Sequence, residues 1–165
     1  MGKVEERSAE ENEGLVCLIA LLVRHEEAIA KLYKKFAENF PDERQFWLRI
    51  ASEETKHATW IRALWFAIEA GTLSVNCQRF DPKSLQTSLD YLEVLLAEAS
   101  QKMSRKMALS TALQIENSLI EKSLFETYEG DDAKARKVFQ QLANGALSHI
   151  RRLEKALRDR QATSS

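Results

Sequence analysis

The sequence contains few of the residues that interrupt helices or cross-link a chain. Its 165 residues include five glycines, two prolines and two cysteines. A β-rich domain of this length needs many more turn residues, whereas long helices joined by few loops do not. Cys17 and Cys77 lack Cys-x-x-Cys spacing, which argues against a disulfide framework or a thiolate metal site. We expect Cys17 to be a small buried residue on a helix and Cys77 to lie in a loop.

An excess of one charge and a long apolar run are absent as well. The 24 basic and 25 acidic residues give a formal net charge of −1, so the chain has no general attraction for nucleic acid or anionic membranes. The longest uncharged apolar run, residues 14–23, is too short to span a bilayer, and it follows acidic residues rather than the basic segment of a secretory signal. We therefore expect a single cytoplasmic domain with its own core.

The first half of the chain predicts two helices, over residues 11–40 and 42–70. In both segments apolar residues recur at alternating steps of three and four, as on the buried face of a helix in a bundle. The expected inward positions are Leu15, Ile19, Leu22, Ile29, Tyr33, Phe36 and Phe40 in the first helix, and Trp47, Ile50, Ile61, Leu64 and Ile68 in the second. Residues 1–10 are polar and are expected to be flexible. Asp42 is the expected N-cap of the second helix, and Gly71 is its expected end.

The second half predicts a connecting helix and another pair of helices. Residues 84–101 form the expected crossover helix, residues 104–129 the third bundle helix and residues 132–160 the fourth, followed by a disordered tail at 161–165. The expected inward positions are Leu85, Leu89, Leu92 and Leu96 in the crossover helix, Leu109, Leu113, Leu119, Ile120 and Leu124 in the third helix, and Phe139, Leu142, Ala146, Leu153 and Ala156 in the fourth. The segment Gly130-Asp131-Asp132 is an expected turn that contains a capping residue for the fourth helix. The crossover helix makes the connection between the second and third bundle helices long, and ferritin-like bundles have one such crossover. We therefore expect an all-α, antiparallel four-helix bundle of the ferritin-like type.

Polar residues interrupt the inward series at five positions. Glu26 interrupts the first helix, Glu54 and His57 the second, Glu116 the third and His149 the fourth. The two halves repeat this arrangement, because His57 is 31 positions after Glu26 and His149 is 33 positions after Glu116. Each half is then a helical hairpin with a Glu on its first helix and a His on its second. Two such hairpins packed about a pseudo-two-fold axis would bring all five side chains to one level of the core.

These five side chains are of the types that bind metals. A Glu three residues before a His on a helix points the same way as the His, so Glu54 and His57 converge. Several carboxylates and imidazoles in a dry core need compensating charge, which a divalent metal supplies. Two-metal sites in bundle cores take a Glu from each of two helices and a Glu-x-x-His from each of the other two. The sequence supplies all but one of these ligands, because Ala146 stands three residues before His149.

The residues around these positions resemble the rubrerythrin branch of the ferritin-like superfamily. The resemblance extends over about residues 14–158. It rests on the segments 26–37 (EEAIAKLYKKFA), 50–58 (IASEETKHA), 115–121 (IENSLIE) and 139–154 (FQQLANGALSHIRRLE). In that family, the residues that match Glu26, Glu54, His57, Glu116 and His149 bind a di-iron centre that reacts with dioxygen or peroxide. Ala146 stands where the family has a further Glu.

The resemblance implies a non-haem iron protein with oxidoreductase or peroxide-scavenging activity and one or two iron ions. Carboxylate and imidazole ligands suit manganese and zinc as well, so the residues leave the metal open. Two cysteines are too few for a four-cysteine iron site in this chain, so electrons are expected to come from a partner protein. Two alternatives remain: a module that binds or senses a single metal, and a metal-free bundle whose polar residues bond to one another and which acts in protein–protein contact.

The polar and aromatic residues near these positions receive simpler interpretations. His25 lies about 100° around the helix from Glu26 and is expected at the surface. Three further glutamates are expected to face solvent: Glu27, Glu53 and Glu121. Tyr33 is interpreted as a core residue that could also donate a hydrogen bond to the site. Trp60 and Trp65 lie off the inward face, where they could cover the crossover helix or a partner chain in a homodimer.

Overall fold

The structure, a computed structural model, describes residues 9–72, 82–99, 103–118 and 132–163. Within these residues all regular elements are helices. They are α1 (Ala9–Asn39), the short 3-10 helix η1 (Pro41–Glu43), α2 (Arg44–Glu69), α3 (Pro82–Glu98), α4 (Arg105–Ser118) and α6 (Ala133–Thr163). The all-α class predicted from the scarcity of turn residues is therefore confirmed for the described part of the chain.

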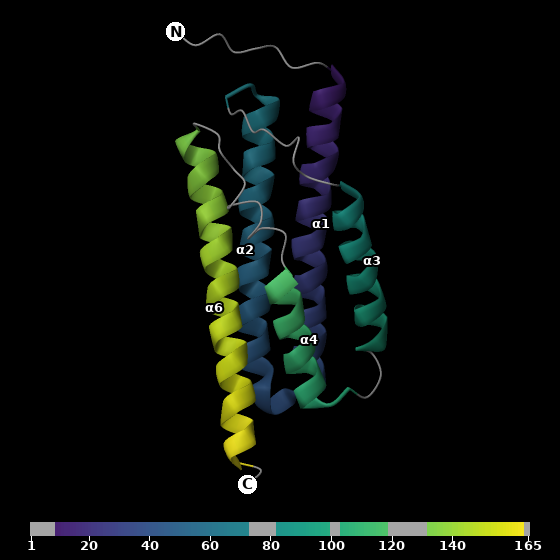
Figure 1. Cartoon of the computed structure of the whole chain (residues 1–165), viewed down its shortest axis with the longest axis vertical. Coiled ribbons are helices and arrows are strands. Elements are labelled where there is room, and N and C mark those ends of the chain that lie inside the picture. The colour runs from purple at the N-terminus through teal and green to yellow at the C-terminus, as the bar shows by residue number, and fades with distance from the viewer. Residues whose placement is uncertain (1–8, 73–81, 100–102, 119–131, 164–165) are drawn as a thin grey trace.

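The helices lie side by side along the long axis of the molecule (Figure 1). α1 and α2 form a hairpin joined by η1. α4 packs against α6, and α6 in turn packs against α2. α3 packs against α1 and lies at the edge of the molecule in this view. Helices from the two halves of the sequence therefore meet along α2 and α6.

Most predicted helix bounds agree with the observed ones to within a few residues. α1 begins at Ala9, so the end of the segment that was expected to be flexible is helical. α6 continues to Thr163, so the prediction of a disordered tail was wrong for residues 161–163. α4 is described only as far as Ser118. Several predictions fall outside the described residues, namely those on Cys77, Leu119, Ile120, Glu121 and Leu124.

The turn between α1 and α2 differs from the prediction. Asp42 is not the N-cap of α2, because it lies inside η1 and α2 begins two residues later. Pro41 explains the difference, since its fixed φ favours the first position of a helical turn, and a 3-10 turn forms before the α-helix. The Asp42 carboxylate instead accepts a hydrogen bond from Arg105 at 2.6 Å, which links this turn to the start of α4.

Two predicted helix ends are confirmed. α2 is followed by Gly71 with a positive φ of 67°. The N–H groups of Gly71 and Thr72 bond back to the carbonyls of Ile68 and Ala67, a glycine-dependent way of closing a helix. At the start of α6, Asp132 Oδ1 accepts the N–H groups of Lys134 at 2.8 Å and of Ala135 at 3.1 Å.

A polar layer divides the apolar core into two clusters. One cluster is rich in aromatic residues, with ring centroids 4.9 Å apart for Phe36 and Trp47 and 5.7 Å apart for Tyr33 and Trp47. The other cluster lies toward the opposite end of α1 and α2 and includes Leu22 and Ile61. Along α1, α2 and α6, the residues that interrupt the apolar series lie between apolar residues of these clusters. The fold thus surrounds one polar level with close-packed apolar side chains.

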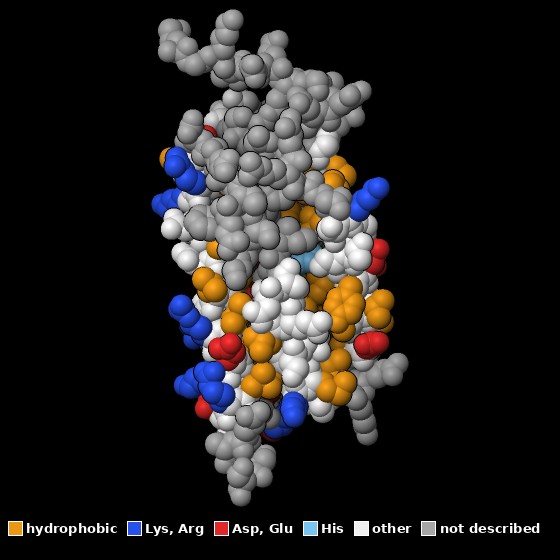
Figure 2. Space-filling model, in the orientation of Figure 1, with side chains coloured by type: hydrophobic (Ala, Val, Ile, Leu, Met, Phe, Trp, Pro, Cys, Tyr) orange, Lys and Arg blue, Asp and Glu red, His pale blue; other side chains and the backbone are white. Residues whose placement is uncertain are grey.

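The surface of the described residues includes Cys17 and a mixture of hydrophobic and charged side chains. Cys17 is exposed rather than buried, because it lies on the side of α1 that faces away from the buried residues Ile19 and Leu22. Figure 2 shows hydrophobic side chains among basic and acidic ones on one face of the molecule. None of the described helices is long and apolar enough to cross a membrane.

Replacing Asp132 with alanine is expected to lower the free energy of unfolding by about 1 kcal/mol, because two N–H groups at the start of α6 lose their acceptor. Asp132→Asn is the matched control, since asparagine caps helices about as well as aspartate. Urea unfolding followed by circular dichroism measures both variants. Equal stability of the alanine and asparagine variants would contradict the cap.

Candidate metal centre

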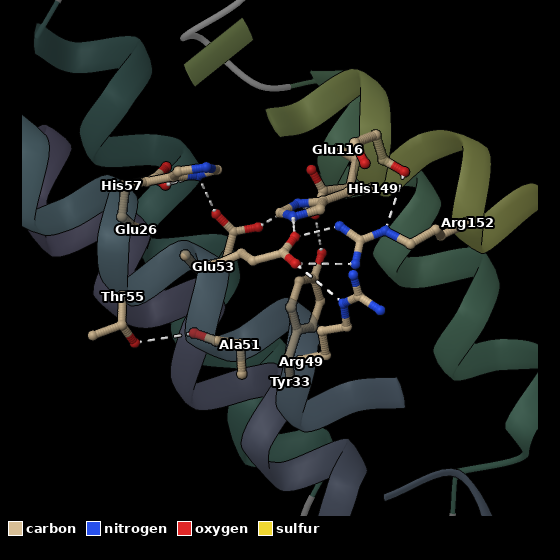
Figure 3. A network of polar contacts seen from close by, with 12 residues as sticks. Glu26, Tyr33, Arg49, Ala51, Glu53, Thr55, His57, Glu116, His149 and Arg152 are labelled. Atoms are coloured by element: carbon tan, nitrogen blue, oxygen red, sulfur yellow. Dashed lines mark hydrogen bonds and ion pairs between the residues drawn. The ribbon is translucent and has the colours of Figure 1, made fainter. Parts of the chain in front are cut away.

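The five polar residues that interrupt the apolar series converge in the interior. Glu54 and His149 are 0% exposed, Glu26 and Glu116 are 1% exposed, and His57 is 6% exposed. They come from α1, α2, α4 and α6, so each of these helices supplies at least one. Figure 3 labels four of them, Glu26, His57, Glu116 and His149, whose side chains lie between the helices. The structure therefore brings together every side chain for which the sequence predicted a place in the site.

Local helix geometry places the two residues of the Glu-x-x-His pair. Glu54 and His57 are three residues apart on α2, so their side chains share one face, and Glu54 Oε2 lies 2.8 Å from His57 Nδ1. The apolar neighbours Ile50 and Ile61 continue the same buried face on either side. The hydrophobic burial of that face turns the polar pair inward, because a helix cannot rotate one turn independently of the next.

Glu54 is shared by two groups of potential ligands. The first group is Glu26, Glu54 and His57, and the second is Glu54, Glu116 and His149. In each group one donor atom per residue lies within 4.8 Å of the others. The Nδ1 atom of His57 is 3.2 Å from Glu26 Oε2, and the Nδ1 atom of His149 is 3.2 Å from Glu116 Oε1. These buried groups could hold metal ions, with Glu54 between them.

The second group is tied to residues outside it. His149 Nε2 lies 2.8 Å from Glu53 Oε2, on the side of the ring opposite Nδ1. Glu53 in turn accepts hydrogen bonds from Arg152, including one from Nη1 at 3.2 Å, and lies 3.5 Å from Arg49 Nε. The Tyr33 hydroxyl, which is fully buried, donates a hydrogen bond to Glu116 Oε1 at 2.8 Å. Tyr33 therefore combines core packing with the hydrogen bond that the sequence allowed for.

Glu53 corrects the prediction that it faces only solvent. Its side chain is 28% exposed, and it lies between His149 and two arginines. Periodicity could not reveal this, because Glu53 is off the inward face of its own helix and reaches a residue of α6. One signal was available: Arg152 lies three residues after His149 and so on the same side of α6.

The imidazole of His57 has a different environment from that of His149. A Cβ atom built on Gly145 would lie 2.5 Å from His57 Nε2, so the ring packs directly against the backbone of α6. The Trp60 ring lies on another side, with its centroid 5.5 Å from that of His57. The two imidazoles stack with centroids 5.7 Å apart.

His25 is the clearest error of the sequence analysis. It is 2% exposed rather than at the surface, and its Nε2 atom lies 2.8 Å from Ser88 Oγ on α3. The prediction considered only the four bundle helices and their shared core. Because α3 covers a second face of α1, residues off the inward face of that helix are also buried.

Opposing effects act on the protonation of both imidazoles. Burial by itself lowers the pKa of His57, but its hydrogen bonds to Glu26 and Glu54 and the charges of these carboxylates outweigh burial and raise the pKa to about 10. Burial likewise opposes the close carboxylates of Glu116 and Glu54 around His149, which raise its pKa to about 11. These pKa values favour the doubly protonated, positively charged form of both rings at neutral pH when no metal is bound.

Charge also shapes the residues that contact these groups. Burial tends to raise the pKa of Glu53, but hydrogen bonds from Arg152 and His149 outweigh it and lower the pKa to about 2. For Tyr33, burial and the nearby charge of Glu116 raise the pKa well above its usual value, so the hydroxyl keeps its hydrogen. Glu53 is thus an acceptor for His149, and Tyr33 is a donor to Glu116.

The donor atoms fit a divalent metal ion. Glu116 Oε2 is buried and has no hydrogen-bond partner among the described residues. Glu54 Oε1 and His149 Nδ1 lie 2.7 Å apart as an ion pair, which a metal ion between the two atoms would replace. Buried polar atoms are normally hydrogen-bonded, so atoms of this kind call for another partner. A cation between them would supply one, and carboxylate and imidazole are ligands for iron, manganese and zinc.

Without metal, the protein is expected to lose stability as the pH rises above 6.5. The pKa values of His57 and His149 are higher in the folded chain, about 10 and about 11, than the ordinary value of 6.5. Their stabilising effect is therefore complete below pH 6.5 and is lost as the pH rises through the folded values, by up to about 1.4 kcal/mol per pH unit for each group. Urea unfolding with a chelator, from neutral pH to about pH 9, measures the slope.

The variants His57→Gln and His149→Gln provide the comparison for this slope. Each variant removes one titrating imidazole. The slope of the unfolding free energy against pH should therefore fall by the contribution of that imidazole. A wild-type slope equal to that of the double variant would show that the imidazoles do not hold these protons.

Comparisons of the chain with protein-family models, with curated proteins and with solved structures found no match. The resemblance to rubrerythrin stays a prediction from the sequence. The burial, distances and donor types of the five side chains are compatible with bound metal ions.

Proposed function

We propose that this chain is a ferritin-like four-helix bundle that binds two metal ions at the shared carboxylate of Glu54. Iron is the metal that we propose. In this proposal α1, α2, α4 and α6 form the bundle, and α3 is the helix of the long crossover. The packing of α1 on α2, of α4 on α6 and of α2 on α6 supports this arrangement. α3 packs against α1 and supplies none of the five polar residues, which supports its role as a crossover helix.

One observation carries the proposal: two buried groups of three ligands share one carboxylate. A carboxylate with two oxygens can bridge two ions, and Glu54 Oε2 faces His57 while Glu54 Oε1 faces His149. Each ion would then have one further carboxylate of its own, Glu26 or Glu116, and one imidazole. A hydrogen-bonded network without metal would satisfy these atoms less well, because Glu116 Oε2 is left without a hydrogen bond among the described residues.

The absence of a Glu at position 146 limits the number of protein ligands that the site offers. Ala146 is 3% exposed and belongs to the core on α6, three residues before His149. With three protein ligands for each ion, coordination positions remain for water or a small exogenous molecule. This feature supports the binding of dioxygen or peroxide, and it also weakens the hold on the metal.

The proposed activity is that of a rubrerythrin-like oxidoreductase that reduces peroxide or dioxygen. Bound iron would supply the change of oxidation state that this chemistry requires. The residues of the chain would bind the metal, exclude bulk water through their burial and hold a proton near it at the Tyr33 hydroxyl. Electrons would come from a partner protein, because the chain has too few cysteines for a four-cysteine iron site.

Substitutions at the ligands are expected to separate the two ions. Glu54→Gln should lose both, because both groups use its carboxylate, whereas Glu26→Gln and Glu116→Gln should each lose one. Glu27→Gln is the matched control, since Glu27 adjoins Glu26 but pairs with Arg62 instead. Elemental analysis of protein loaded anaerobically with ferrous iron measures the number of ions per chain.

The outcomes distinguish the proposal from its alternatives. One ion in the wild-type protein, lost equally in all three ligand variants, would favour a single-metal module. No bound ion, with a melting temperature unaffected by added metal or chelator, would favour a metal-free bundle. The oxidoreductase proposal requires in addition a visible or near-ultraviolet iron absorption that bleaches on reduction and returns on addition of hydrogen peroxide.

Restoring the missing carboxylate is expected to tighten metal binding. Ala146→Glu would place a second Glu-x-x-His pair on α6, like the one on α2, and should raise the affinity for ferrous or manganous ions by about tenfold or more. Asn144→Glu is the control, because position 144 is exposed on the same helix. Titration calorimetry measures both. An equal effect of the two variants would show that added charge alone is responsible.

A further inference from the structure

We infer that the two ion sites are unequal, and that the group of Glu54, Glu116 and His149 takes the first ion because Glu53 positions the His149 imidazole for it. This inference rests on the proposed metal-binding function and deepens it. It follows from the surroundings of the two imidazoles, because His149 has a carboxylate on its outer nitrogen, whereas His57 packs there against the backbone at Gly145.

The first contact fixes which nitrogen of His149 can bind a metal. A carboxylate oxygen accepts hydrogen bonds, so Glu53 Oε2, at 2.8 Å, holds the hydrogen of the ring on Nε2. The lone pair of the neutral ring then lies on Nδ1, which faces Glu54 at 2.7 Å and Glu116 at 3.2 Å. Metal-binding histidines commonly have such a carboxylate on their other nitrogen, which orients the ring and makes it a stronger ligand.

Glu53 is itself held in place by two arginines. Arg152 donates to both of its oxygens, and Arg49 lies 3.5 Å from one of them. Because Arg152 is on α6 with His149 while Glu53 is on α2, this pairing joins the two helices beside the site. The orientation of the imidazole is thus fixed before any ion binds.

The carboxylate of Glu116 is also oriented from outside. The Tyr33 hydroxyl bonds to Glu116 Oε1 at 2.8 Å, and the Tyr33 ring is fixed among Phe36 and Trp47 in the aromatic part of the core. Both ligands that belong to this half alone are therefore held by named neighbours. Preorganised ligands lose little conformational freedom when the ion arrives.

The internal repeat shows what the other half lacks. At the offset that relates His57 to His149, Glu53 and Glu54 correspond to Gly145 and Ala146. The position that corresponds to Glu53 therefore has no side chain, and His57 packs against the α6 backbone there. The second half of the sequence thus has neither a carboxylate that corresponds to Glu54 nor a side chain that could orient His57 as Glu53 orients His149.

Removing a carboxylate of this kind typically lowers metal affinity by about 10- to 100-fold. The half of the site that contains His57 has no carboxylate at the position that corresponds to Glu53. We therefore expect the affinities for the two ions to differ by about 10- to 100-fold. Zinc is a suitable probe, because it is diamagnetic and takes the same ligands. The chain has only three histidines, so the nitrogen spectrum of histidine-labelled protein is simple to assign.

The experiment is a titration of the metal-free full chain with Zn²⁺, followed by ¹⁵N NMR of the histidine side chains. The signals are assigned with His57→Gln and His149→Gln variants. The first equivalent is expected to shift the Nδ1 signal of His149 and leave that of His57, which moves only with the second equivalent. Movement of His57 first, or of both signals together, would overturn the inference while leaving metal binding intact.

Substitution of Glu53 tests its positioning role. Glu53→Ala is expected to lower the affinity for the first Zn²⁺ by about 10- to 100-fold and to abolish the order of filling. Glu53→Gln keeps a hydrogen-bond acceptor without the charge. This variant should partly restore the affinity for the first Zn²⁺ and the order in which the two sites fill. The matched control is Glu27→Ala, because Glu27 also adjoins a proposed ligand and also pairs with an arginine, Arg62, on a neighbouring helix.

The results separate this inference from the function on which it rests. A Glu53→Ala variant that binds Zn²⁺ in the wild-type order with wild-type affinity would overturn the role of Glu53 alone. No response of either His57 or His149 to two equivalents of Zn²⁺ in the wild-type chain would overturn the proposed metal centre, and the inference with it. Circular dichroism of each variant confirms that its helices remain folded.

Discussion

The structure depends on how five ionisable side chains are compensated at one level of an apolar core. An isolated carboxylate at such a place is costly, and three of them with two imidazoles are tolerable only as a connected group. Glu54 makes the connection, since its two oxygens face the imidazoles of both hairpins. In the absence of metal, protons on the imidazoles supply the opposite charge, and a metal ion would displace them.

The surrounding fold serves this polar level by making it rigid and dry. Aromatic packing around Trp47 closes one side, and the aliphatic cluster that includes Leu22 and Ile61 closes the other. α3 adds a second layer over α1, which buries His25 as well. Because these apolar faces fix the rotation of each helix, the ligands approach one another without being able to turn away toward water.

The two hairpins are similar in plan but differ in detail. The first contributes a complete Glu-x-x-His pair and the carboxylate of Glu53, whereas the second has Gly145 and Ala146 at the matching positions. Glu53 reaches across to the imidazole of the second hairpin, so the imidazole without such a carboxylate is His57 rather than His149. Gly145 and Ala146 precede His149 in the sequence, but the imidazole that lacks an orienting carboxylate is His57 on the other hairpin.

The sequence by itself determined the all-α class, most helix bounds and the inward placement of Glu26, Glu54, His57, Glu116 and His149. These follow from periodicity, because a residue that interrupts an apolar face must share the burial of that face. The tertiary structure alone decided the burial of His25, the exposure of Cys17 and the contact of Glu53 with His149. Periodicity describes the faces of a single helix, whereas these three depend on which other helix lies opposite each face and how far its side chains reach.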